Sequence, residues 1–355
     1  MDIHWQAYWT PDCKRWWQGA TRLAAAAALT ISGWAVLATP ALASDVETLL
    51  RAMQRAQEAV VGIEVQIVDG ATSARTLGTQ REGSGVLISD DGLMLTIGYL
   101  VLEAERVQIV THDGRRLPAR VVAYDLATGF GLLQALAPLR HAPVPLAARD
   151  EQAGDAALTV ISGGDAGEVE AVRLVSRRAF SGFWEYHVEG ALFTSPPARR
   201  HSGAALFNAR GELLGMGSLV VPDAGGPGQP RTPGNLFVPV ELLLPVLAEM
   251  RAQGRSLASA RPWLGVNCAE QAGQLRVLRV ADDSPADVAG LQVGDRITRL
   301  DGVKVAALAQ LWKALWADAR PERAVLLEIE RGGLPMTITV QAVDRAKTLK
   351  RADGI

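Results

Sequence analysis

The sequence predicts a mainly β fold, built as barrels or a sandwich, and three features lead to that prediction. Short apolar runs recur at close spacing, and several alternate apolar with polar residues, as 60–68 does. An Asp-Gly pair at 91–92 stands between two such runs, where glycine can adopt the positive φ of a hairpin turn. The segment 222–233 is rich in proline and glycine and is predicted to be a loop. Many short strands joined by such turns are typical of barrels and sandwiches.

The predicted elements of the first two thirds follow one helix. Asp45 can cap a helix that runs to about Ala59, since apolar residues recur there at helical spacing. A second helix is predicted at about 240–252, after the last strand of this part. Strands are expected between the two helices at 60–68, 83–89, 93–96, 106–111, 121–124, 131–135, 157–162, 170–174, 186–188, 204–207, 213–221 and 234–238.

The last third has strands around two further helices. Ser284 can cap a short helix with Pro285 in its first position, and Gly290 ends it. A second helix is expected at about 306–318. Strands at 324–331 and 336–341 then close this part of the chain.

The first 43 residues have the pattern of a secretory signal peptide. A basic stretch up to Arg22 precedes an apolar run at 23–38, and the small residues Ala41 and Ala43 form a cleavage site. We therefore expect export and cleavage after Ala43. The alternative is an uncleaved leader that anchors the chain in the membrane, because the apolar run is near the lower limit for spanning a bilayer.

Composition excludes several classes of function. The chain has 355 residues, 48% hydrophobic and 21% charged, which is globular material for two or three domains. Its formal net charge of −2 becomes −3 without the leader, so nucleic acid is not an expected partner. Only Cys268 remains beyond the leader, and we expect it to be buried in a strand. The chain has no Cys/His set for zinc, and neither a metal nor a cofactor is expected.

Three groups of motifs resemble the HtrA (Deg) family of exported trypsin-like serine proteases. They are the stretch 83–96, the loop 201–208, and the segment 263–266 together with 284–286 and 290–295. The likeness covers nearly the whole chain beyond the leader. It implies a trypsin-like double β-barrel followed by a PDZ domain, and a periplasmic location.

The resemblance divides the chain into five parts. A signal peptide at 1–43 and the double barrel at 44–252 are followed by a linker at 253–262. The PDZ domain is expected at 263–343, and a basic tail at 344–355 ends the chain.

The resemblance also places the catalytic positions, and two of them carry the wrong residue. Ser202 matches the serine nucleophile, whereas Tyr99 stands at the position of the histidine and Gly129 at that of the aspartate. The nearest acidic residue, Asp125, is not at the triad position. Arg200 replaces a glycine whose N–H helps form the oxyanion hole in the family.

These replacements predict a catalytically inactive protein in which Ser202 is a vestigial nucleophile. A serine hydroxyl needs a base to take its proton, and a tyrosine phenol with a pKa near 10 is itself protonated at neutral pH. His201 is adjacent to Ser202, but neighbouring side chains on a tight loop usually diverge. The alternative is an active serine endopeptidase in periplasmic protein quality control that uses Ser202 with an unidentified base.

The PDZ segment departs less from its family. Trp263, Leu264, Gly265 and Val266 match the turn whose N–H groups bind a terminal carboxylate, and the next strand can pair with a ligand. The resemblance thus implies binding of polypeptides or protein C-terminal tails, as an adaptor, scaffold or chaperone. The alternative is a structural subunit of an envelope assembly whose groove is idle.

Oligomeric state is a further point of comparison with the family, whose members commonly trimerise through the region before the first barrel. The segment 44–59 contains no aromatic residue that could anchor such an interface. The resemblance implies a trimer and this segment does not support one, so the oligomeric state stays open. Membrane contact is expected only through an uncleaved leader.

Overall fold

The computed structural model describes residues 40–147, 157–165 and 167–350. The predicted signal peptide at 1–43 lies almost wholly outside these residues. Within them, no helix is long and apolar enough to cross a membrane.

The first helix is longer than the sequence indicated. α1 spans Pro40–Ala59, so the prediction that Asp45 caps it is wrong. Alanine and leucine at 41–43 favour helix, and proline is well tolerated in a first turn, which explains the earlier start. One face of α1 places Ala52, Ala56 and Ala59 in the core, while Leu50 is exposed.

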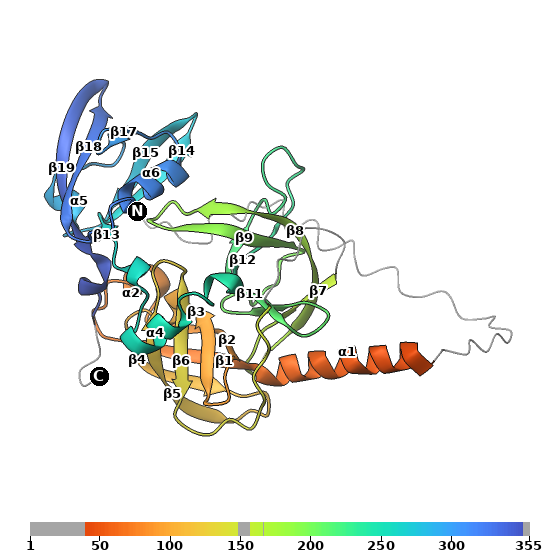
Figure 1. Cartoon of the computed structure of the whole chain (residues 1–355). Coiled ribbons are helices and arrows are strands. Elements are labelled where there is room, and N and C mark those ends of the chain that lie inside the picture. The colour runs from red at the N-terminus through yellow and green to blue at the C-terminus, as the bar shows by residue number, and fades with distance from the viewer. Residues whose placement is uncertain (1–39, 148–156, 166, 351–355) are drawn as a thin grey trace. The chain divides into compact units, whose positions relative to one another are not determined.

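The next six strands close into a barrel, in the order β1-β2-β3-β6-β5-β4 (Figure 1). Gly92 has φ +84° in the turn between β2 and β3, as the Asp-Gly pair predicted. Every strand predicted between 60 and 135 is present. The strands are β1 Val60–Ile67, β2 Gln80–Leu87, β3 Leu93–Ile97, β4 Ala104–Val110, β5 Arg116–Tyr124 and β6 Phe130–Ala135.

A second closed barrel has the order β10-β11-β12-β9-β8-β7. Two of its strands, β8 and β9, are much longer than predicted and form a hairpin whose turn is 182–186 (Figure 1). The added residues mix the polar stretch 176–178 of β8 with the apolar run 191–193 of β9, which was not predicted as a strand. The strands are β7 Ala157–Ile161, β8 Val169–Ser181, β9 His187–Ser195, β10 Ala205–Phe207, β11 Leu213–Val221 and β12 Gly234–Pro239.

The helix expected at 240–252 is interrupted. A 3-10 turn at Val240–Leu242 is separated from α4, Leu247–Gln253, by a segment that contains Pro245. Proline lacks an N–H and disfavours helical backbone in the residue before it. The pattern of apolar residues therefore predicted a continuous helix where the backbone could not form one.

The PDZ domain is one sheet with its own hydrophobic core. The strand order is β13-β19-β18-β16-β15-β14, and β17 pairs with β16, so β14 lies at one edge. Ser284 caps α5 as predicted, accepting from the Asp287 N–H, and Cys268 is fully buried in β14. The elements are β13 Pro262–Trp263, β14 Val266–Gln271, β15 Gln274–Val280, α5 Pro285–Val288, β16 Arg296–Leu300, β17 Val303–Lys304, α6 Leu308–Trp316, β18 Arg323–Arg331 and β19 Leu334–Asp344.

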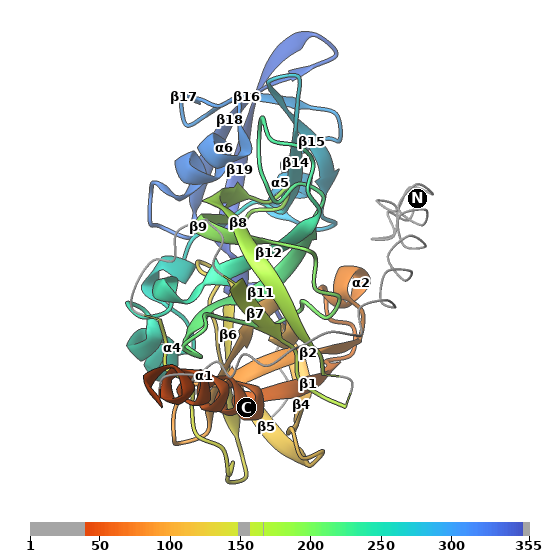
Figure 2. The same cartoon turned by 90° about the vertical axis from the view of Figure 1, so that its right-hand side faces the viewer.

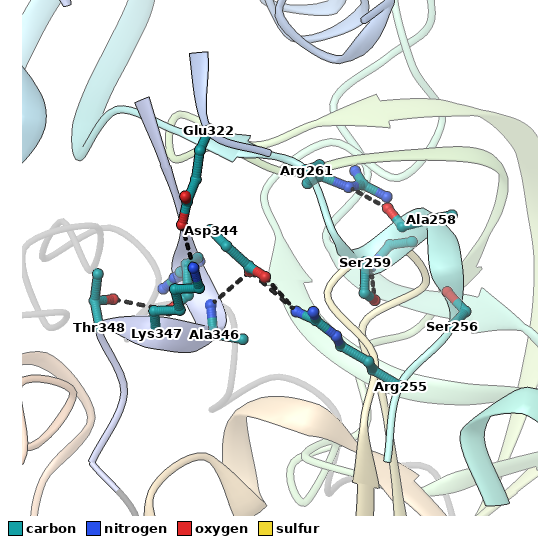
Figure 3. Close-up of polar contacts among 12 residues, drawn as sticks. Arg255, Ser256, Ala258, Ser259, Arg261, Glu322, Asp344, Ala346, Lys347 and Thr348 are labelled. Carbon is teal, nitrogen blue, oxygen red and sulfur yellow. Dashed lines mark hydrogen bonds and ion pairs between the residues drawn. The ribbon is translucent and has the colours of Figure 1, made fainter. Parts of the chain in front are cut away.

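An ion pair joins the linker to the last residue of β19. Arg255 donates to both carboxylate oxygens of Asp344, at 3.0 and 2.8 Å, and Lys347 pairs with Glu322 (Figure 3). Farther on, the Lys350 N–H donates to Glu103 beside the first barrel, at 2.9 Å. The predicted basic tail therefore begins at the last residue of β19, and its described part, 344–350, contacts the first barrel at Lys350.

Candidate functional site

The serine loop is held between the two barrels. The carbonyl of Ser202 accepts from the Ser84 N–H of β2 at 2.9 Å, and the Gly203 N–H donates to Gly217 of β11 at 2.8 Å. Gly203 has φ +69°, and a Cβ there would lie 2.1 Å from the Ser84 carbonyl oxygen. Glycine is thus required after the serine, and the main chain at Ser202 is fixed.

Tyr99 faces this serine, where the resemblance placed the base. It lies in α3, Gly98–Val101, the one-turn helix after β3. Its hydroxyl donates to the Ser218 carbonyl at 3.1 Å. Burial raises the pKa of Tyr99 to about 12, although a hydrogen bond with the Ser202 side chain partly offsets this. The phenol is therefore protonated at neutral pH and cannot take a proton from Ser202.

Arg81 fixes the position of Tyr99 and was not singled out in the sequence. This buried guanidinium donates through Nη1 to the carbonyls of Tyr99, at 2.7 Å, and Leu102, at 2.9 Å. Its Nη2 donates to the Ser73 hydroxyl at 2.7 Å. Burial lowers the pKa of Arg81 to about 10, so the group remains charged at neutral pH. Arg81 lies two residues before the strand predicted at 83–89, so no sequence pattern marked it.

Gly129, which the resemblance placed at the aspartate position, lies beside the start of α3. Its carbonyl accepts from the Gly98 N–H at 2.7 Å, and its φ is +83°. A Cβ on Gly129 would lie 2.8 Å from the Tyr186 hydroxyl, which donates to the Thr128 carbonyl at 3.2 Å. The phenol of Tyr186 therefore occupies the space into which a side chain at 129 would extend.

Asp125 has a structural environment. Its buried carboxylate accepts from the Thr128 N–H at 2.9 Å and hydroxyl at 2.7 Å, from the Ser256 N–H at 2.9 Å, and from the Ser259 hydroxyl. Burial raises the pKa of Asp125, but these hydrogen bonds outweigh it and leave the pKa below its ordinary value. The group joins the turn after β5 to the linker.

The two residues before Ser202, Arg200 and His201, lie in different surroundings. Burial lowers the pKa of His201, and its Nδ1 is buried without a hydrogen-bond partner in the described part of the chain. Arg200 is exposed and is not among the four non-glycine residues with positive φ in that part. His187 is bonded to Ser181 at 2.8 Å and Glu189 at 3.0 Å.

The PDZ turn binds a carboxylate, and the carboxylate comes from the same chain. Oε1 of Glu185 accepts from the N–H groups of Leu264, Gly265 and Val266 at 3.1, 2.7 and 3.1 Å. Burial raises the pKa of Glu185 to about 7, even though these hydrogen bonds lower it. Trp263, predicted with these residues, lies in β13 and is not one of the three donors.

The residues before Glu185 continue along the PDZ domain. The Cys268 N–H of β14 donates to the Phe183 carbonyl at 2.6 Å, and Trp184 and Asn267 form an antiparallel bridge. The indole N–H of Trp312 in α6 donates to the Gly182 carbonyl at 3.0 Å. The turn of the β8–β9 hairpin thus contacts both β14 and α6; the two strands of the hairpin are labelled in Figure 2.

Two sequence patterns match described families of domains. The pattern of the trypsin-like peptidase domain matches residues 83–216, and that of the PDZ domain matches 262–342. Among curated proteins, the periplasmic pH-dependent serine endoprotease DegQ of Escherichia coli is 27% identical over 273 residues, 73% of this chain and 58% of DegQ. The serine endoprotease DegS of Haemophilus influenzae is 26% identical over 306 residues, 83% of this chain and 87% of DegS.

The chain is homologous to the HtrA proteases. A probable periplasmic DegP-like endoprotease of Ectopseudomonas mendocina is 30% identical over 278 residues, 72% of this chain. This HtrA homologue spans just over half the length of the DegQ and DegP-like relatives, 58% and 56%.

Solved structures confirm the fold of this HtrA homologue. A serine endoprotease from Yersinia pestis has a TM-score of 0.52 at 23% identity, over 83% of this chain and 97% of that one. The HtrA-type protease AlgW, solved with a tripeptide, has a TM-score of 0.51 at 22% identity, over 86% and 99%. The predicted double barrel followed by a PDZ domain is therefore confirmed.

Proposed function

We propose that this HtrA homologue is a catalytically inactive periplasmic protein that binds polypeptides or protein C termini through its PDZ domain, as an adaptor, scaffold or chaperone. One observation carries the proposal: the N–H groups of Leu264, Gly265 and Val266 converge on a carboxylate. A chain terminus presents the same group. The turn therefore has the geometry that recognition of a C terminus requires.

The environment of Ser202 supports the loss of proteolysis. Acyl transfer by a serine needs a base that accepts the hydroxyl proton and an acid that orients that base. Tyr99 and Gly129 supply neither, and Tyr186 occupies the space beside Gly129. Loss of the histidine alone lowers turnover about a millionfold in a serine protease.

A serine-reactive fluorophosphonate probe tests this part of the proposal. We expect the full chain and its Ser202→Ala variant to be labelled equally weakly, and neither to cleave casein. An active HtrA homologue should serve as the positive control. Labelling and casein cleavage that depend on Ser202 would show instead that the protein is an endopeptidase.

Binding is tested with fluorescein-labelled decapeptides of randomised sequence, prepared with a free C-terminal carboxylate or as the C-terminal amide. Because Glu185 occupies the turn, both the native chain and its Glu185→Ala variant should be titrated. We expect the carboxylate pool to bind at least one of them more tightly than the amidated pool. If neither protein distinguishes the two pools, the proposed binding of C termini is wrong.

Gly265 is not a suitable position for this test. It has φ +86°, and a Cβ there would lie 2.3 Å from the Cβ of Ser284. Any other residue would distort the turn whether or not the turn binds a ligand. The N–H groups of residues 264–266 are better tested by substitution of Glu185, whose carboxylate they contact.

A second function, endopeptidase activity with a relocated base, is favoured only by the retention of Ser202 in a loop fixed at both barrels. Such activity would require His201 or another base to accept the proton of the Ser202 hydroxyl. The periplasmic location and cleavage after Ala43 also belong to the proposal. N-terminal sequencing of the exported protein tests the cleavage directly.

A further inference from the structure

We propose that the turn 182–186 of the β8–β9 hairpin is an intramolecular ligand of the PDZ groove, and that a C terminus binds by displacing Glu185. The second half of this statement rests on the proposed function. The first half concerns the chain alone and has its own test.

The carboxylate of Glu185 occupies the place of a terminal carboxylate. Three successive N–H groups of the turn donate to it, and its side chain is only 9% exposed. A terminal carboxylate needs the same donors. Two carboxylates cannot share them, because each N–H makes one good hydrogen bond and the two charges would repel each other. Occupancy by Glu185 and by a C terminus is therefore mutually exclusive.

The main chain of the turn also takes the place of a ligand strand. β14 is an edge strand of the PDZ sheet, and a bound peptide would pair with it by β-augmentation. The Cys268 N–H, two residues beyond the carboxylate-binding turn, already donates to Phe183. The direction of this pairing is antiparallel, as the bridge between Trp184 and Asn267 shows. Glu185 thus takes the place of a ligand's terminal carboxylate, and residues 183–184 take the place of its strand.

Contacts around the turn hold it in this position. Trp312 donates to Gly182 from α6, whereas the neighbouring Lys313–Glu189 pair is exposed and contributes little. Within the turn, the Trp184 ring stacks on Tyr186 with centroids 5.9 Å apart and planes 10° from parallel. Aromatic packing within the turn therefore stabilises its conformation.

An internal ligand sets a threshold for external ones. A tethered segment competes at an effective concentration on the order of millimolar. The apparent Kd of a peptide equals its intrinsic Kd divided by the fraction of protein with an open groove. If the groove is open in about a tenth of the molecules or fewer, removal of Glu185 should strengthen binding about tenfold or more.

The test compares the native chain, Glu185→Ala and Glu189→Ala by fluorescence anisotropy with the carboxylate decapeptide pool. Glu189 is the matched control, since it lies on the same hairpin and contacts α6 but not the turn at 264–266. We expect Glu185→Ala to bind about tenfold or more tightly than the native chain, and Glu189→Ala to differ less than threefold. Equal affinity of native and Glu185→Ala proteins would overturn the displacement model while leaving the proposed function standing.

If no peptide binds, hydrogen exchange tests whether Glu185 occupies the carboxylate-binding turn of the same chain. In the native chain, the amides of 264–266 should be protected by Glu185, and in Glu185→Ala they should exchange at least tenfold faster. Thermal unfolding of each variant checks that it is folded. If peptides spanning 262–268 exchange equally in both folded proteins, Glu185 does not occupy the turn in solution and the inference is wrong.

Discussion

At the scale of single residues, the structure opposes restoration of the catalytic residues more strongly at position 129 than at position 99. Tyr99 could be replaced by histidine without a change of backbone, because it lies in an ordinary helical turn fixed by Arg81. Gly129 is different. Its positive φ and the nearby Tyr186 hydroxyl leave no space for a carboxylate. The aspartate position is therefore the more deeply altered of the two.

This difference predicts the result of rebuilding the triad. The double variant Tyr99→His, Gly129→Asp should show no Ser202-dependent labelling by a fluorophosphonate, since the introduced carboxylate could not reach the introduced imidazole past Tyr186. The Tyr99→His variant alone is the control, and it should behave in the same way. Strong labelling of the double variant that disappears on Ser202→Ala would contradict this account of the site.

At the scale of elements, the Asp125 carboxylate joins the turn after β5 to the linker before the PDZ domain. The variant Asp125→Asn replaces an acceptor oxygen with an NH₂ group that faces donors from Thr128, Ser256 and Ser259. We expect a loss of about 2–4 kcal/mol in the free energy of unfolding at pH 7, measured by urea denaturation.

The matched control for Asp125 is Asp282→Asn, which changes an exposed carboxylate paired with exposed Arg75. Its urea midpoint should stay close to that of the native chain, because exposed ion pairs contribute little. The pKa of Asp125 lies below its unfolded value, so this stabilisation is present above about pH 4 and is lost as pH falls through the folded pKa. Equal destabilisation by both variants at pH 7 would argue against a special role for Asp125.

The elements also show what sequence reasoning can reach. The strand β1 was predicted within one residue, because polar and apolar residues alternate over 63–67 as strand geometry requires. The extension of the β8–β9 hairpin was missed because the polar residues 176–178 of β8 pair with the apolar residues 191–193 of β9, and a polar stretch has no strand pattern of its own. The helix at 240–252 was wrong because Pro245 outweighs the apolar spacing.

The candidate site divides in the same way. Ser202, Tyr99 and Gly129 were singled out by resemblance, and the structure places Tyr99 beside Ser202 and Gly129 beside the start of α3. Leu264, Gly265 and Val266 were found as a carboxylate-binding turn. Glu185 could not be found, because its contact joins residues about 80 positions apart and no local pattern marks it. Long-range pairing of this kind appears only in the folded chain.

At the scale of the whole described molecule, contact between the second barrel and the PDZ domain passes through a buried carboxylate whose protonation changes near neutral pH. The folded pKa of Glu185 is about 7, raised by burial and lowered by the three N–H groups and Arg345, with Cys268 also nearby. Unfolded glutamate has a pKa near 4.3. Between these values the native state binds more protons than the unfolded state, so its stability falls as pH rises.

Glu185→Gln should remove this pH dependence while keeping an acceptor oxygen for the turn. Relative to the native chain, we expect the variant to gain about 1–3 kcal/mol of stability between pH 5 and pH 8, because one pKa unit corresponds to about 1.4 kcal/mol. Glu103→Gln is the control. Burial raises the pKa of Glu103, but hydrogen bonds from Ser73 and Lys350 lower it further, so its contribution does not change above pH 5. Thermal unfolding at several pH values measures the stability of both variants.

A stability difference between native and Glu185→Gln proteins that stays constant from pH 5 to pH 8 would contradict this account. It would show that the Glu185 carboxylate is not buried in solution and that the hairpin does not contact the PDZ turn.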